Sequence, residues 1–236
     1  MFMISLLTTL TFGQTIREVF VPPSGAIRLY EDEFSVWLGE LELASAHEPV
    51  RTHRGDIVAH HARVIRLPMV AGNLQQCADS AIRLRAEYLE SINAEVMFHA
   101  TSGDPISWDR WRSGYRPFEV NGRLQWREGT QGGWEAYLSK VFMWAGTRSL
   151  ELDTVAVSDP QPGDLIVVPG SPGHVIVLLD VAIAQHQVFV LVGEGYMPAQ
   201  SFHIELGPHN GWWEWTDGVS LAHWHMPATG LRRWIR

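Results

Sequence analysis

The sequence predicts an α+β fold in which a cysteine-bearing helix packs on an antiparallel sheet. A stretch with helical periodicity occupies residues 71–93, and a cluster of short apolar segments follows residue 164. The predicted helices and the cluster of strands are therefore segregated along the chain rather than alternating, which is the order expected of an α+β domain. A chain of 236 residues is long enough for one such domain with a sizeable core.

The helix is predicted from the stretch AGNLQQCADSAIRLRAEYLESIN, with Asn73 as its N-cap. Apolar residues recur at intervals of three and four along one face, namely Leu74, Cys77, Ala81, Leu84 and Tyr88. Cys77, the single cysteine of the chain, falls in the first turn, where unpaired amides and the helix dipole favour a thiolate. A cysteine on an apolar face can equally be an inert packing residue.

An insertion rich in aromatic residues and glycine is expected around residues 100–150 of a single domain that spans residues 15–236. It begins as an irregular segment with a hairpin and continues into a second helix that starts at Trp134 and ends near Gly146. The buried face of that helix is predicted to hold Trp134, Tyr137, Leu138, Val141 and Phe142.

Four strands are predicted after the insertion, and their ranges are Leu165–Val168, His174–Asp180, Val188–Val192 and Phe202–Leu206. The second and third are expected to form a hairpin with Asp180 opposite Val188, which places His174 opposite Glu194. Cross-strand neighbours have Cβ atoms about 5 Å apart, so Glu194 can hold the His174 ring. Asp180 lies about 20 Å from His174 along the strand, so it is expected to cap the strand or face water.

These elements together predict a site for covalent catalysis on a carbonyl group. Cys77 at a helix start would be the nucleophile, His174 at a strand start would be the base, and Glu194 would orient the histidine. The chain order of cysteine, histidine and polar group is that of papain-like folds.

Further side chains are expected to bind the substrate beside this trio. Gln75 or Gln76 would donate to the oxyanion next to the Cys77 amide. Tyr196, in the segment GYMPAQ, would form a wall of the site near the histidine.

The stretch QPGDLIVVPGSPGHVIVLLD resembles the "GDL…HVGIY" segment of NlpC-type cell-wall peptidases, which have a papain-like fold. In those enzymes the aspartate is mainly structural, which implies the same role for Asp164 at the start of a strand. The resemblance implies a hydrolase or acyl transferase of the bacterial cell envelope. Its substrate would be a peptide, a peptidoglycan stem peptide or another amide.

Four separated motifs make a second resemblance, and these are LQQCADSAIRLRAEYL, VFMWAGTRSL, PGDLIVVPGSPGHVIVLLDVA and GYMPAQSFHIE. Together they are similar to the bacterial family called domain of unknown function 4846, from about residue 17 to the C-terminus. That family resembles exported proteins and lipoproteins, which implies export. Its pattern usually has glutamine where this chain has Glu194; glutamine would orient a neutral ring, whereas glutamate favours the charged imidazolium.

Composition and the N-terminal segment restrict the partners and the cellular location that the sequence predicts. The net charge of −8 argues against a nucleic-acid surface, and a single cysteine excludes an intramolecular disulfide. Residues 1–14 have the apolar length of a signal segment but lack its positive start, so a short strand is the alternative. No segment is predicted to cross a membrane.

Two other functions stay open. In the first, the chain is a non-catalytic envelope module whose eleven tryptophans line a glycan or peptide groove, although core packing would also explain them. In the second, histidines bind a metal; His223 and His225 would then share a strand face as a ligand pair. Because no pair of histidines shows the helical spacing of a zinc protease, we assign no metal and no cofactor.

Overall fold

The computed structural model describes residues 13–29, 32–58, 62–130 and 132–235. The predicted leader lies almost wholly outside these residues, so its nature stays a prediction. The helices are α1 (Ile16–Val19), α2 (Glu33–Gly39), α3 (Cys77–Ser91), α4 (Trp108–Arg112), α5 (Trp134–Trp144), α6 (Leu150–Asp153) and the 3-10 turn η1 (Ala228–Gly230). None of the helices in the described part of the chain combines the length and apolar character needed to span a membrane.

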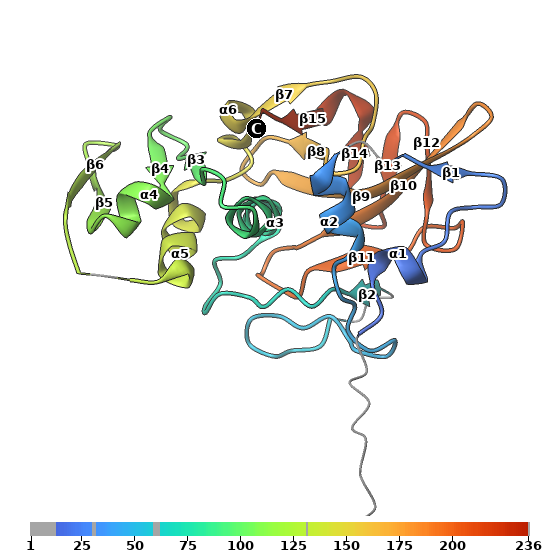
Figure 1. Cartoon of the computed structure of the whole chain (residues 1–236), viewed down its shortest axis with the longest axis horizontal. Helices are drawn as coiled ribbons and strands as arrows, with labels where there is room; N and C mark the ends of the chain where they lie inside the picture. Colours follow the sequence, from blue (N-terminus) through green and yellow to red (C-terminus); the bar gives the residue numbers. More distant parts are fainter. Residues whose placement is uncertain (1–12, 30–31, 59–61, 131, 236) are drawn as a thin grey trace, which may run out of the picture.

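A large antiparallel sheet forms the centre of the fold, which confirms the α+β class (Figure 1). Its strands are β1 (Ile27–Arg28), β2 (Ala62–Val64), β7 (Thr154–Ala156), β8 (Leu165–Val168), β9 (His174–Ala184), β10 (Gln187–Glu194), β11 (His203–Glu205), β12 (Trp213–Trp215) and β15 (Leu231–Trp234). They run in the order β2-β11-β10-β9-β8-β15-β7, with β1 also pairing with β9 and β12 with β10.

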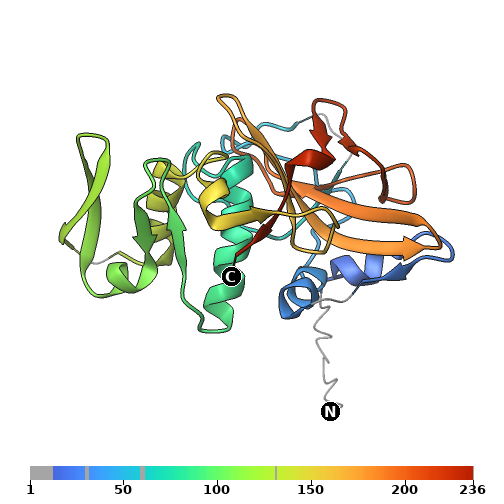
Figure 2. The same cartoon turned by 90° about the horizontal axis from the view of Figure 1, so that it is seen from above.

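Three further hairpins stand outside the main sheet. They are formed by β3 (Met97–His99) with β4 (Pro105–Ser107), β5 (Tyr115–Val120) with β6 (Arg123–Glu128), and β13 (Gly218–Ser220) with β14 (His225–Pro227). The first two, with α4 and α5, make up the expected insertion, and the β5–β6 hairpin lies at its far end (Figure 2). In Figure 1, α3 is seen end-on between the insertion and the sheet.

The sheet is buried on both faces. Odd-numbered β9 residues such as Val175 and Val177 belong to the core formed with α2 and α3. Even-numbered Ile176 and Leu178 belong to a second core, closed by the β13–β14 hairpin. A strand covered on both sides reads as a continuous apolar run, which explains the sequence HVIVLL.

The long helix begins later than predicted. Gln76 is its N-cap and Cys77 its first residue, whereas we expected the cap at Asn73. The Asn73 carboxamide oxygen instead accepts a hydrogen bond from Ala199 N–H at 2.7 Å. The expectation that Cys77 lies in the first turn is confirmed.

The predicted register of the β9–β10 hairpin is wrong, because the strands run on to a tight turn at Gln185 and His186. Next to the turn Gln187 pairs with Ala184, and this register continues to the pair of Leu191 with Asp180. Beyond a bulge, Val192 pairs with Leu178. The bulge adds one residue on β9, so the side chains of β9 change face there, whereas those of β10 alternate without interruption. Glu194 consequently shares a face with His174, as predicted, but lies diagonal to it.

Two buried aspartates anchor the sheet through ion pairs. Asp180 does not face water as expected, since its carboxylate accepts from Arg28 Nε at 2.6 Å. Asp164, next to β8, accepts two hydrogen bonds from Arg233, each 2.8 Å long. The structural role expected for Asp164 fits this placement.

The tryptophans pack within the molecule. None of the eleven is in the exposed class, and Trp111 and Trp212 are buried. In the insertion, Trp108 and Trp134 meet edge to face and both contact the ring of Tyr137, which belongs to the predicted buried face of α5.

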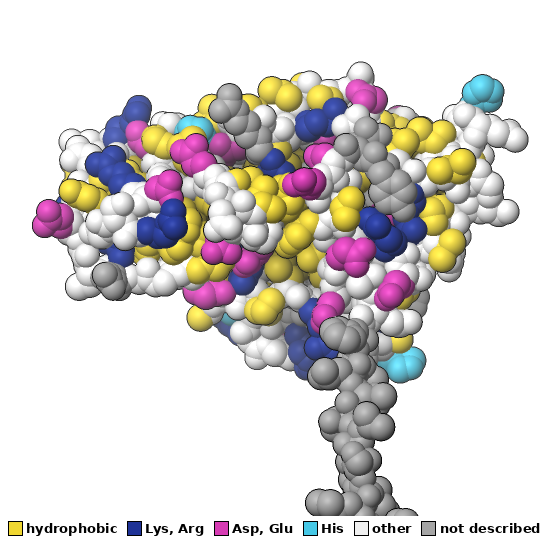
Figure 3. Space-filling view, in the orientation of Figure 1, with side chains coloured by type: hydrophobic (Ala, Val, Ile, Leu, Met, Phe, Trp, Pro, Cys, Tyr) yellow, Lys and Arg dark blue, Asp and Glu magenta, His cyan; other side chains and the backbone are white. Residues whose placement is uncertain are grey.

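The face seen in Figure 3 carries basic and acidic side chains interspersed over all its elements. This mixing fits a modest net charge rather than a surface of one sign.

Candidate functional site

Cys77 lies where the start of α3 meets the start of β9. Backbone N–H groups of Ala78 and Val175 point at its sulfur, and Val175 directly follows His174. The side chain is 6% exposed. Burial raises the pKa of the thiol to about 11, with the charge of Asp79 adding to the effect and the two backbone amides opposing it. At neutral pH the resting sulfur is therefore a thiol.

His174 and Glu194 form a buried pair. Nε2 of His174 lies 2.6 Å from Oε2 of Glu194, and both side chains are 1% exposed. Because an ionised carboxylate only accepts hydrogen bonds, Nε2 carries the proton that it donates. In the neutral ring Nδ1 then bears a lone pair, and this buried atom has no hydrogen-bond partner in the described part of the chain.

A pocket of about 320 Å³ opens at the cysteine. Its walls are the first turn of α3, the end of α5, the loop between β8 and β9, and Met197. Cys77 and Gln76 both line it, so a substrate in the pocket would meet the sulfur at a helix N-terminus, where amides lack carbonyl partners.

The two glutamines expected at the oxyanion differ in their placement. Gln75 is fully buried and is not among the residues that line the pocket; its Oε1 accepts from Val70 N–H at 3.1 Å and from Arg83 at 3.0 Å. Gln76 lines the pocket, and its amide Nε2 donates to Asn73 O at 3.3 Å. Of the two, only Gln76 is in place to contact a bound molecule.

Tyr196 lies beside the histidine as expected, with its ring centroid 5.3 Å from that of His174. Burial raises its pKa, and the charges of Glu194 and Cys77 act in the same direction. The tyrosine therefore stays a neutral wall of the site.

Asp79, in the first turn of α3, is a buried carboxyl that the sequence interpretation overlooked. Its Oδ2 accepts from Gln76 N–H at 2.9 Å, which caps the helix. Burial raises its pKa from 3.8 to about 7, against the effect of backbone hydrogen bonds. The pattern of an acidic residue three positions after a helix cap was the available signal.

Three other residues gather around Glu194 and were not foreseen as a site. His203 Nε2 lies 3.7 Å from Glu194 Oε1 and 3.2 Å from Glu205 Oε1, while His223 Nε2 lies 3.1 Å from Glu194 Oε1. The hydrogen bond to Glu194 raises the pKa of His223 against the effect of partial burial. The alternation His203-x-Glu205 on one strand was the signal in the sequence.

The ligand pair suggested by His223 and His225 does not form. His223 turns to Glu194, whereas Nδ1 of His225 lies 2.9 Å from Ser220 Oγ. The rings of His223 and His225 therefore contact different residues.

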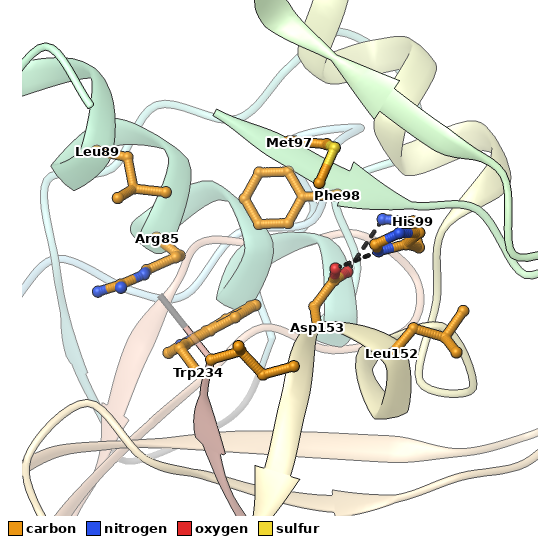
Figure 4. A pocket seen from close by; sticks show the side chains of 9 residues that line it. Arg85, Leu89, Met97, Phe98, His99, Leu152, Asp153 and Trp234 are labelled. Carbon is orange, nitrogen blue, oxygen red and sulfur yellow. Dashed lines mark hydrogen bonds and ion pairs between the residues drawn. The ribbon is translucent and has the colours of Figure 1, made fainter. Parts of the chain in front are cut away.

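A second pocket, of about 250 Å³, lies beside the second half of α3, between β3, α6 and β15 (Figure 4). Phe98, Leu152 and Trp234 give it apolar walls, and Nδ1 of His99 lies 2.6 Å from Asp153 Oδ1 at its edge. No cysteine lines it, so the chemistry proposed for Cys77 does not belong there.

Comparison with known proteins identifies the family and no function. No curated protein and no solved structure matches the chain. The model of the family described as domain of unknown function 4846 matches residues 16–233, which include Cys77, the His174–Glu194 pair and the residues around Glu194. The chain therefore belongs to the family of domain of unknown function 4846.

Proposed function

We propose that the protein is a cysteine-dependent hydrolase or acyl transferase that acts on an amide or ester carbonyl. Cys77 is the nucleophile, His174 is the general base and acid, and Glu194 holds the histidine ring. The observation that carries the proposal is the placement of His174. Its Nε2 lies on Glu194, its Nδ1 has no hydrogen-bond partner among the described residues, and the next residue, Val175, directs its N–H at the sulfur.

The resting thiol makes proton transfer part of the attack. As the sulfur forms its bond to the carbonyl carbon, its proton passes to Nδ1 of His174, and Glu194 stabilises the imidazolium that results. The imidazolium then protonates the leaving amine or alcohol, which departs and leaves a thioester on Cys77. Water, or an acceptor nucleophile in a transferase, then attacks the thioester and gives a proton to Nδ1. The C–S bond breaks, the acyl product departs, and the imidazolium returns the proton to the sulfur of Cys77.

The papain-like, NlpC-type arrangement and the envelope setting are parts of this proposal. They are supported by the order of Cys77, His174 and Glu194 along the chain and by the GDL segment before the histidine strand. On that basis the substrate is a peptide or peptidoglycan-like amide, and the protein acts after export.

The alternative of a non-catalytic envelope module has one observation in its favour, the buried and protonated Cys77. The tryptophans that would line its groove are packed against other side chains instead, as Trp108 and Trp134 are against Tyr137. The catalytic proposal, unlike the binding-module alternative, gives a role to the buried His174–Glu194 pair.

The test is acylation of Cys77 by an activated ester such as p-nitrophenyl acetate, followed by intact-mass and peptide analysis. We expect one acetyl group on Cys77, none in Cys77→Ser, and at least a hundredfold slower acylation in His174→Gln. His225→Gln, in a ring away from the site, is the matched control and should react like the wild type. If His174→Gln also acylates at the wild-type rate, Cys77 is merely a thiol in a pocket and the proposal is wrong.

A further inference from the structure

The cluster behind the His174–Glu194 pair is the strongest unassigned feature of the molecule. Glu194 uses Oε2 for His174 and turns Oε1 toward His203, which also faces Glu205. His203, Glu194 and Glu205 are 0%, 1% and 5% exposed. Their ligand atoms all lie within 4.8 Å of one another.

The hydrogen bond at the other end of the His203 ring fixes which nitrogen faces the carboxylates. Nδ1 lies 2.8 Å from the carbonyl oxygen of Ser201, so Nδ1 is the donor. Nε2 of the neutral ring then presents a lone pair to two carboxylate oxygens. A cation placed among these three atoms would be bound by all of them, and a metal ion is such a cation.

The spacing fits a metal ion. Zinc binds histidine nitrogen and carboxylate oxygen at about 2.0–2.2 Å in tetrahedral sites, which puts neighbouring ligand atoms about 3.3–3.6 Å apart. His203 Nε2 lies 3.2 Å from Glu205 Oε1 and 3.7 Å from Glu194 Oε1. A backbone carbonyl on the far ring nitrogen is also the partner that orients metal-binding histidines.

We propose that Glu194, His203 and Glu205 bind one divalent transition-metal ion, with Zn²⁺ as the representative ion. The ligand atoms are Glu194 Oε1, His203 Nε2 and Glu205 Oε1, and the fourth position is open to water. His223, whose Nε2 lies 3.1 Å from Glu194 Oε1, borders this site and is 27% exposed. The ion sits behind the catalytic pair proposed above and does not depend on Cys77.

The neighbouring strands position these ligands. Glu194 pairs with His203 across β10 and β11, and Glu205 pairs with Val192, so all three side chains leave the same face of the sheet. A site built on paired strands needs no loop closure to form.

The experiment uses the full chain without a histidine tag, stripped with a chelator and titrated with Zn²⁺ by calorimetry and with Co²⁺ by absorption spectroscopy. We expect one ion per chain and visible Co²⁺ bands of four-coordinate intensity. Glu205→Gln, which keeps the side-chain shape, should weaken Zn²⁺ binding at least tenfold. Glu214→Gln, an exposed glutamate on β12, is the matched control and should bind like the wild type.

Two results would overturn the inference. One is the absence of Zn²⁺ binding by the wild-type chain at submillimolar concentration, a measurement that needs no variant. The other is binding that survives Glu205→Gln but is lost in Cys77→Ser, which would place the ion on the thiol. Full occupancy in a Cys77→Ser chain supports the inference even if the acylation test fails.

Discussion

Glu194 reaches His174 diagonally across two strands: its Oε2 lies 2.6 Å from Nε2 of the histidine, while its own register partner is His203. The carboxylate of Glu194 therefore contacts histidine rings on both strands that flank β10, His174 on β9 and His203 on β11.

Removal of the Glu194 carboxylate should lower the free energy of unfolding. Glu194→Ala leaves the buried His174 ring without its acceptor, and breaking a buried charged pair from one side costs about 3–5 kcal/mol of unfolding free energy. Glu194→Gln keeps an oxygen acceptor and should cost less than half as much. Urea denaturation of both variants in chelator measures the difference, and equal losses would show that shape rather than the acceptor matters.

The buried Asp79 should make the protein less stable as pH rises. Its pKa is raised from 3.8 to about 7 in the folded state, so the folded chain binds more protons than the unfolded chain between these values. The free energy of unfolding therefore falls as pH increases from about 4 to 7, by at most about 4 kcal/mol at about 1.4 kcal/mol for each pKa unit.

Asp79→Asn tests this directly. It should flatten that part of the stability profile and make the protein more stable than the wild type at pH 8, since the cap oxygen is retained. A variant with the same pH dependence as the wild type would contradict the assignment to Asp79.

Asp79→Asn should also lower the pKa of the Cys77 thiol. Burial is the main cause of the raised pKa of Cys77, and the charge of Asp79 is the second. Without that charge the thiol ionises at lower pH, so alkylation by iodoacetamide at pH 8 should become severalfold faster. Asp109→Asn, at an exposed position of α4, controls for net charge and should leave the rate unchanged.

Asp164 should prove structural. Asp164→Ala removes a buried partner of Arg233 and should destabilise the fold by about 3–5 kcal/mol. Asp109→Ala, which breaks an exposed pair with Arg112, should change stability by less than about 1 kcal/mol. In the folded fraction, acylation of Cys77 should be unaffected by Asp164→Ala; a lower rate would give the aspartate a part in the site.

Close packing at Gly195 should hold the start of α3 in place. A Cβ at this position would lie 3.0 Å from Gln76 O and 3.1 Å from Ser80 Cβ, both on the helix that begins with Cys77. Gly195→Ala should cost about 1–3 kcal/mol through overpacking and slow the acylation of Cys77. Gly133→Ala, with open space around it, should do neither.

The strand positions and the presence of the cysteine-bearing helix could be predicted because each is a local property of the sequence, although the helix begins three residues later than expected. The apolar runs after Asp164 and His174 set the starts of β8 and β9, and both starts are correct. The register could not be predicted, since it depends on a turn at Gln185 and His186 without glycine and on a bulge opposite Leu191.

Glu194 was nevertheless found, because the register error near it is two residues. With a side-chain period of two, an even shift keeps a residue on the same face. His203 and Glu205 were missed as site residues although the strand that holds them was predicted. Their relation to Glu194 arises from strand pairing, which sequence spacing does not report.

The two oxygens of Glu194 also connect the interior of the protein to its surface. His223 is partly exposed and shares this carboxylate with His174, which is buried. A positive charge on His223 would polarise the shared carboxylate and so alter its hydrogen bond with His174. A change in the medium at His223 is thereby felt at the ring beside Cys77, with no movement of the chain between them.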